Sequence, residues 1–510
     1  MSIAPISTVK LNVRPIYIDM SHTYVYEGPC RFGKGEELSY EFDRAMNAEN
    51  NKRFLKDIAD HAPRWVNVLE PVYVERTDDW RIPEDMIQAM AQGYEETDFY
   101  LFADGARCGD VMLEFIRHYP KPCAVLSDCR AHSIIFAAMS SHDCEVYPAT
   151  SWTELTRYLT AVRVRKMLRE MRVLLSYRFN ANQSLPSAPD SFNDLDQVTK
   201  RFGTRFRFLN LHELMDMLHV IPNDQNPTTP GRRRLNLTEA DMEEIGRMAD
   251  QFIAGARDNV LPRQEVVNTL KMYKVIRKNM DDEDCNAFCA PCPDACSTRR
   301  LNEERCTMCL SHSLNNELGL PSACEYDVTA LFCMAILLGV SGKAPYMSNT
   351  IACQLDEEGL FPACPFLTRE DLAPVVGMDN LMLTYHSVPN RKMHGLDSED
   401  SQYGIQPFAY SDWAATLRYD FTQDKGQPVT QIRIDPNCRR MMIARGTVQA
   451  GFGYDKANCT EGLIFTVQDA EGYVRTQKYF GLHMPLVLGD YVEELKAVAE
   501  VLGLEPVVCL

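Results

Sequence analysis

The stretch "DFYLFADGARCGDVMLEFIRHYPKPCAVLSD", residues 98–128, sets the fold class of the first part of the chain. Its two ends, "DFYLFAD" and "PCAVLSD", have the aromatic and β-branched content that is typical of strands. Between them lie a glycine turn and an amphipathic stretch that predicts a helix. This order is typical of a βαβ unit, in which parallel strands carry helices on both faces of the sheet. The runs 13–19 and 65–74 predict two further strands, so we expect residues 1–150 to form a Rossmann-like α/β domain.

A second α/β series comes directly after it. The stretch 151–171 predicts a long helix, and 172–178 is the first of its predicted strands. The run 237–280 predicts a further helical stretch, which leads into a cysteine-rich segment at 285–309. We therefore expect a second Rossmann-like α/β domain over residues 151–345.

The last third of the chain has a different sequence pattern. From about residue 380, short alternating runs such as "NLMLTYHSV", "PVTQIRID", "RMMIARGTVQA" and "YVRTQKYF" are separated by Gly, Pro, Asn or Asp. This pattern predicts antiparallel strands in a barrel or sandwich. The stretch 489–503 predicts a closing helix. The sequence thus predicts two α/β domains followed by an antiparallel β-barrel-like domain at 346–510.

Charge and hydropathy exclude some classes of partner. The chain of 510 residues has 53 Lys and Arg against 71 Asp and Glu, a formal charge of −18. That charge repels phosphate backbones and acidic membranes, so we expect no nucleic-acid or membrane partner. The longest apolar run, 331–340, is about half of a membrane span. Residues 1–15 show no secretory signal, so we expect a cytoplasmic protein whose 18 cysteines are reduced.

Two acidic residues precede that apolar run, in "LPSACEYDVTALFCMAILLGVSGKAPYMSN" (320–349). Asp327 is well suited to cap the helix that begins after it. Glu325 is a weaker capping residue, and its neighbours are small or apolar. A buried, ionised glutamate needs a partner such as a metal ion. The residues that could share such a site are Asn349, His386, His394 and His483.

The stretch "LSHSLNNELGLPSACEYDVTALFCMAILLGVSGKAPYMSN" (310–349) resembles the central motif of the L-fucose isomerase/L-arabinose isomerase-like sugar isomerases. The ending "YFGLHMPLVLGDYVEELKAVAEVLGLEPV" (479–507) resembles the C-terminal signature of that family. The runs "LTYHSVPNRKMHGL" and "PVTQIRIDP" look like motifs of its β domain. The resemblance implies a three-domain fold and a homo-oligomer, a trimer or hexamer, with sites near subunit interfaces.

The same resemblance implies the roles of individual residues. Glu325 matches a glutamate that binds a divalent ion, Mn²⁺ or Mg²⁺, and transfers a proton, and His483 matches a metal-binding histidine. Asn349 stands where the family has a second metal-binding carboxylate, and this is a departure. An amide oxygen can coordinate a metal, but it does not accept a proton at neutral pH. Asp327 and His386, the latter as a second-sphere or substrate-contacting residue, are the candidates to replace that carboxylate.

These observations predict an aldose–ketose isomerase that acts on a small sugar through an ene-diol. The departure at Asn349 leaves an alternative with the same fold and metal, namely epimerase or lyase chemistry on a sugar derivative. A second alternative is a non-catalytic protein that senses a sugar or the redox state through its cysteines.

The cysteine-rich segment contains two CxxC pairs that could bind zinc or an iron–sulfur cluster. Reduced packing thiols are the simpler interpretation. The segment leads into "LSHSLNNELG" (310–319), which the resemblance predicts to be a core strand and loop. The six cysteines of the candidate cluster are Cys285, Cys289, Cys292, Cys296, Cys306 and Cys309.

Overall fold

The structure is a computed structural model in which the chain forms two compact units, residues 9–163 and residues 1–8 with 164–510. We refer to these as the N-terminal unit and the main unit. Among the described residues, no helix has both the length and the apolar character needed to cross a bilayer. The described residues are 3–22, 35–77, 81–103, 108–126, 130–178, 194–221, 228–229, 232–233, 235–296 and 298–510.

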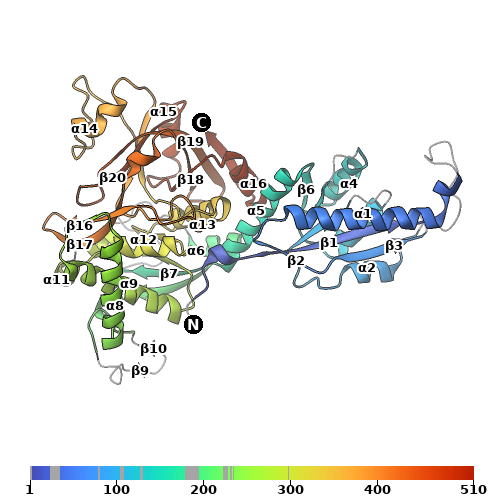
Figure 1. Ribbon diagram of the computed structural model, residues 1–510, viewed down its shortest axis with the longest axis horizontal. Coiled ribbons are helices and arrows are strands. Elements are labelled where there is room, and N and C mark those ends of the chain that lie inside the picture. The colour runs from blue at the N-terminus through green and yellow to red at the C-terminus, as the bar shows by residue number, and fades with distance from the viewer. Residues whose placement is uncertain are drawn as a thin grey trace. The chain divides into compact units, whose positions relative to one another are not determined.

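The N-terminal unit is a parallel sheet with helices on both sides, as the sequence predicts (Figure 1). The strand order is β2-β1-β4-β5-β6, and β3 also pairs with β1. Aromatic residues of the strands and of α3 form much of its core, where Phe102 and Phe115 meet edge to face. The strands are β1 (Leu11–Met20), β2 (Val66–Val68), β3 (Val72–Arg76), β4 (Phe99–Phe102), β5 (Cys123–Leu126) and β6 (Val146–Ala149). The helices are α1 (Tyr40–His61), α2 (Glu84–Met90), α3 (Gly109–His118), α4 (Arg130–Ser141) and α5 (Trp152–Glu170).

One predicted strand of this unit is interrupted. The run 65–74 forms two short strands, β2 and β3, rather than one. Pro71 lies between them and has no N–H group for a ladder hydrogen bond. The Glu70 carbonyl just before it accepts a hydrogen bond from Arg14 Nη1 at 2.8 Å instead.

The main unit begins with a second, smaller parallel sheet of order β13-β12-β7-β8. The predicted helical run 237–280 is divided into α8 and α9 by a segment that contains the short strand β11 and ends at Pro262, the residue that precedes α9. The strands of this part are β7 (Arg172–Tyr177), β8 (Arg205–Asn210), β9 (Thr228–Thr229), β10 (Arg232–Arg233), β11 (Asp258–Asn259), β12 (Ala287–Cys289) and β13 (Ser322–Ala323). The helices are α6 (Leu195–Phe202), α7 (Leu211–Asp216), α8 (Glu239–Gly255), α9 (Arg263–Asp282), α10 (Cys292–Cys296), α11 (Arg299–Glu304), α12 (Cys309–Glu317) and α13 (Val328–Ser341).

The C-terminal part contains the predicted antiparallel strands in a curled sheet of order β14-β15-β20-β19-β18-β21. A further strand, β22, pairs with β19 in parallel, and β11, β16 and β17 form a separate three-stranded sheet. The strands are β14 (Asn349–Ala352), β15 (Leu381–His386), β16 (Tyr403–Ala409), β17 (Trp413–Tyr419), β18 (Pro428–Ile434), β19 (Arg440–Phe452), β20 (Glu461–Thr466), β21 (Leu486–Leu488) and β22 (Glu505–Cys509). The helices are α14 (Arg369–Leu372), α15 (Ala470–Gln477) and α16 (Val492–Leu502).

Backbone hydrogen bonds also join the two edges of this curled sheet. The N–H groups of Tyr346 and Leu486 each donate to the carbonyl of the other, at 2.9 Å in both directions. Asn349 then forms an isolated antiparallel bridge with His483. The seam between β14 and the segment before β21 therefore brings together two residues that are 134 positions apart in the sequence.

Two segments differ in secondary structure from the sequence prediction. The segment 310–319 belongs to helix α12 rather than to a strand and loop, and nearly all of this helix is buried. The run "YVRTQKYF" is largely helix α15 rather than a strand. Asp469 caps α15 by accepting from the Gly472 N–H group at 2.9 Å, and Glu471 pairs with Arg475 one turn later. These local contacts outweigh the β propensity of the aromatic and β-branched residues.

The overall class is thus a mixed α/β protein with parallel sheets and a curled antiparallel sheet. Helix α13 connects the two kinds of sheet in the main unit, and its residues 328–339 are buried on every side. It contacts β13 of the parallel sheet and β18 of the antiparallel sheet. Its N-terminus therefore lies where the parallel sheet and the curled antiparallel sheet of the main unit meet. The predicted division of this unit at residue 345 stays a prediction.

Candidate metal centre

The N-terminus of α13 is capped by Asp327, as predicted. Its Oδ1 atom accepts a hydrogen bond from the Ala330 N–H group at 2.8 Å. The carboxylate has no solvent exposure, so capping alone would leave its second oxygen buried and unsatisfied.

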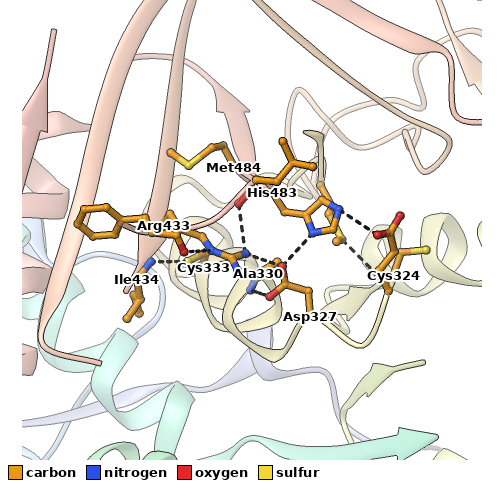
Figure 2. A network of polar contacts seen from close by, with 12 residues as sticks. Cys324, Asp327, Ala330, Cys333, Arg433, Ile434, His483 and Met484 are labelled. Carbon is orange, nitrogen blue, oxygen red and sulfur yellow. Dashed lines mark hydrogen bonds and ion pairs between the residues drawn. The ribbon is translucent and has the colours of Figure 1, made fainter. Parts of the chain in front are cut away.

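The second oxygen of Asp327 binds two other side chains. Oδ2 accepts hydrogen bonds from Arg433 Nη1 at 2.6 Å and from His483 Nδ1 at 2.9 Å. Arg433 lies on β18 and also donates to the backbone carbonyl of His483 at 3.2 Å. Figure 2 shows His483 held between Asp327 and the region around Cys324. Because Nδ1 donates to a carboxylate, His483 carries its proton there, and its Nε2 atom presents a lone pair.

Glu325 lies in a strained turn between β13 and α13. Glu325 and Tyr326 both have a φ of 59°, in the left-handed region that most side chains avoid. Two such residues cost about 1–2 kcal/mol each. The turn is held in part by the Tyr326 N–H group, which donates to the Ala290 carbonyl at 2.8 Å. Strain of this kind is retained at functional sites, where it fixes the direction of a side chain.

The turn directs the Glu325 carboxylate toward two imidazole rings. Oε1 lies 3.6 Å from His386 Nε2, and Oε2 lies 3.6 Å from His483 Nε2. Both histidines are fully buried, whereas the Glu325 side chain is 25% exposed. Part of the Glu325 side chain is therefore accessible to solvent.

His386 lacks the support that Asp327 gives to His483. It is the last residue of β15, it is fully buried, and neither of its ring nitrogens has a hydrogen-bond partner among the described residues. The distance of 3.6 Å to Glu325 is too long for a hydrogen bond. A buried imidazole without a partner is costly, and a cation between Nε2 and the carboxylate would remove that cost.

The separation between the Glu325 carboxylate and each imidazole is that of two ligands of one metal ion. Ligand atoms about 2.1 Å from an ion lie about 3.0–3.6 Å from one another, depending on the coordination angle. The two separations of 3.6 Å are at the upper end of this range. The Glu325 and His386 ligand atoms also lie within 4.8 Å of each other and of the Cys324 thiol. The Oε1 atom of Glu325 thus faces His386 and its Oε2 atom faces His483, so a divalent cation bound by both carboxylate oxygens would lie near both imidazoles, although His483 is outside the group whose ligand atoms all lie within 4.8 Å of one another.

Asn349 lies next to His483 through the seam of the curled sheet. The Thr350 N–H group donates to the Leu482 carbonyl, and the Met484 N–H group donates to the Ser348 carbonyl. Asn349 and His483 are thus a non-hydrogen-bonded antiparallel pair, the arrangement that brings opposite side chains closest together. Asn349 accordingly lies at the edge of the candidate metal centre.

His394 does not join this group. Its Nε2 atom lies 2.8 Å from the hydroxyl of Tyr419 and 3.3 Å from Asp424. It therefore belongs to a different polar network of the main unit.

In the part of the chain that the structure describes, the six cysteines of the candidate cluster do not form one group with metal-binding geometry. Cys285, Cys289, Cys292, Cys306 and Cys309 are buried, and Cys296 is exposed. Among the described residues, no group with metal-binding geometry includes two of these six. Instead, Cys292 lies beside His312 and Cys324. A hydrogen bond from Cys324, together with the His312 imidazole, lowers the pKa of Cys292 well below its usual range.

The sequence did not identify three residues of this region as site residues: His312, Cys324 and Arg433. Each of them belongs to the site because of a contact with a residue elsewhere in the sequence. Arg433, for example, contacts Asp327. One signal was visible for Arg433, because a lone arginine in the alternating run "PVTQIRID" is unusual for a buried strand. No family model matches this chain, and no curated protein matches it.

Proposed function

We propose that the protein is a divalent-metal-dependent enzyme that interconverts aldose and ketose forms of a small sugar through an ene-diol. The observation that supports this most is the position of the Glu325 carboxylate, 3.6 Å from each of two imidazole nitrogens and partly open to solvent. The proposal includes a fucose isomerase-like fold, with which the mixed α/β architecture is compatible.

Glu325, His386 and His483 would hold the ion, with Asn349 as a further oxygen donor. A bound divalent ion supplies Lewis acidity, which polarises the carbonyl and hydroxyl oxygens of a sugar. Two imidazole nitrogens favour manganese or another transition ion over magnesium, since magnesium prefers oxygen ligands. Asp327 acts on this centre indirectly, by holding the Nδ1 proton of His483.

Glu325 would also move the proton between the two adjacent carbons. Asp327 is unsuited to this task because it is fully buried and both of its oxygens already accept hydrogen bonds. Asn349 has no basic group. One carboxylate can remove a proton from one carbon and return it to the next on the same face of an ene-diol. Epimerisation delivers the proton to the opposite face, and a single base does not do this.

A lyase-type reaction on a sugar derivative is the second candidate, and it is compatible with Asn349 in place of the second carboxylate of the family pattern. Elimination requires removal of one proton and departure of a neighbouring group, and so it also needs a single base. The second carboxylate of the family pattern is then dispensable. For either reaction we also propose, from the resemblance alone, that the protein is cytoplasmic and forms a homo-oligomer, a trimer or hexamer.

Solvent deuterium incorporation tests the proposal. The purified protein is incubated with Mn²⁺ in D₂O and a panel of pentoses, deoxyhexoses and the sugar acids derived from them, and the compounds are then analysed by mass and by proton NMR. We expect deuterium at the carbon next to the carbonyl, together with formation of the ketose or aldose partner, and neither in Glu325→Gln. A keto-deoxy product from a sugar acid would favour the lyase reaction instead. The absence of exchange and of product with every sugar would contradict both.

A further inference from the structure

A second group of ligating side chains lies beside the candidate metal centre, and it takes no part in the proposed reaction. It consists of Cys292 at the start of α10, His312 on α12 and Cys324 just after β13. Their ligand atoms all lie within 4.8 Å of one another, and Cys292 Sγ is 3.4 Å from His312 Nε2. All three side chains are buried.

His312 is oriented toward the sulfur atoms by its surroundings. Its Nδ1 atom lies 2.8 Å from the Ser322 hydroxyl oxygen. Its ring stacks on Phe288, with centroids 5.7 Å apart and an interplanar angle of 26°. A hydroxyl partner on Nδ1 is the kind of second contact that fixes a metal-binding histidine, and it leaves Nε2 directed at Cys292.

The donor set and spacing are those of a zinc site. Two cysteines and one histidine are among the established sets of zinc ligands. Sulfur at about 2.3 Å and nitrogen at about 2.0 Å from a tetrahedral zinc ion lie about 3.5 Å apart. The separation of 3.4 Å between Cys292 Sγ and His312 Nε2 is close to this value.

We propose that Cys292, His312 and Cys324 form a zinc site next to the Glu325–His386–His483 centre, with the Cys324 thiol within 4.8 Å of ligand atoms of both groups. The three ligands come from α10, α12 and the end of β13, so the zinc ion cross-links three segments of the main unit. Cys324 immediately precedes the residues with positive φ, Glu325 and Tyr326. The zinc ion would therefore anchor the strained turn that directs the Glu325 carboxylate. This inference stands on its own residues and does not require the proposed reaction.

Metal analysis of the purified full chain tests this site. Zinc is measured by plasma mass spectrometry in the wild type and in Cys292→Ser, His312→Ala and Cys324→Ser. Cys333→Ser is the matched control, because Cys333 is a fully buried thiol on α13 that lies outside the group. We expect one zinc ion per chain in the wild type and in the control, and at least a tenfold lower zinc content in the other three variants. A wild type that neither contains zinc nor takes up one equivalent on addition would overturn the proposal.

A second measurement keeps the test decisive if a variant fails to fold. Wild-type protein reconstituted with Co²⁺ should show an intense thiolate-to-cobalt charge-transfer band, and its absence at full cobalt loading would overturn the two-thiolate site. Glu325→Gln separates the two proposed centres. It should lose manganese while keeping zinc, and parallel loss of both metals would mean one mixed centre rather than two.

Discussion

The Nδ1 atom of His483 lies 2.9 Å from Oδ2 of Asp327, a residue 156 positions earlier in the chain. The same oxygen accepts from Arg433 at 2.6 Å, and the other oxygen of Asp327 caps α13. One buried carboxylate thus stabilises a helix end, an arginine and the orientation of a candidate metal ligand. Its substitution should affect both stability and metal binding.

Asp327→Asn should keep the helix cap, because asparagine is an equally good capping residue. It removes the negative charge beside Arg433 and His483, so we expect the metal affinity to fall about 10–100-fold. Asp327→Ala should in addition lower the free energy of unfolding by about 3–5 kcal/mol, because it leaves the Arg433 guanidinium buried and unpaired. Manganese titration and denaturant unfolding measure the two effects. Asp490→Asn is the control, because the ion pair of Asp490 with Arg445 is exposed. Equal losses of manganese affinity in Asp327→Asn and in the control would contradict the role of Asp327 in orienting His483.

His386 and His394 of the C-terminal part should behave differently. His386→Ala should reduce manganese binding, because Nε2 of His386 faces the Glu325 carboxylate. His394→Ala should leave manganese binding unchanged, because His394 lies with Tyr419 and Asp424. Isothermal titration with Mn²⁺ checks both variants. A larger loss of manganese affinity in His394→Ala than in His386→Ala would contradict a metal centre at Glu325.

Asn349→Asp should strengthen manganese binding, since it adds a carboxylate next to His483 at the seam of the curled sheet. We expect a gain of about tenfold in affinity, and a faster deuterium exchange if a second base assists Glu325. The same titration and the D₂O assay measure these effects. Unchanged affinity would show that the side chain of residue 349 does not reach the ion.

The thiols outside the zinc group should behave as packing residues. Cys289→Ser and Cys306→Ser bury a hydroxyl in place of a thiol, and we expect each to lower the free energy of unfolding by about 1–2 kcal/mol. Both variants should keep their zinc, and the purified protein should be colourless and free of sulfide. Loss of a stoichiometric metal in either variant would restore the cluster that the two CxxC pairs predict.

The contribution of Asp19 to the stability of the N-terminal unit should fall as the pH rises through the range from about 4 to 6. Burial raises the pKa of Asp19 to about 6, although Tyr73 donates a hydrogen bond to its carboxylate. The folded unit then binds more protons in this range than the unfolded chain, so the free energy of unfolding falls as the pH increases. Asp19→Asn should flatten this dependence by an amount on the order of 2 kcal/mol. Denaturant unfolding between pH 4 and pH 7 measures it, and an unchanged slope would exclude Asp19 as the cause.

The local features of the fold could be predicted from the sequence. The strands of the N-terminal unit arise from runs of aromatic and β-branched residues, and the cap at Asp327 depends only on its own helix. Helix α15 was predicted as a strand because "YVRTQKYF" has high β propensity, whereas the Asp469 cap lies just outside that run. The β propensity of the run therefore gave the wrong prediction, because the Asp469 cap outside the run stabilises a helix.

The candidate centre was only partly predictable, because it depends on contacts between distant segments. The sequence identified Glu325 as a buried carboxylate that needs a partner, and the resemblance assigned metal-binding roles to Glu325 and His483. Nothing in the sequence shows that His386 would lie 3.6 Å from Glu325. Spacing alone suggested a site made of two CxxC pairs. The structure instead places Cys292 with His312 and Cys324, since α12 and the turn after β13 pack beside α10. Regular spacing of cysteines shows which ligands are available, and the fold selects among them.

Manganese binding by four proteins tests the central claim most directly: the wild type, Glu325→Gln, His386→Ala and His483→Ala. Free Mn²⁺ is followed by electron paramagnetic resonance during titration of each folded protein, with circular dichroism as the check on folding. We predict one ion per chain in the wild type and at least a tenfold weaker affinity in each of the three variants. Wild-type affinity in all three folded variants, or no manganese binding by the wild type, would contradict a metal centre built on Glu325.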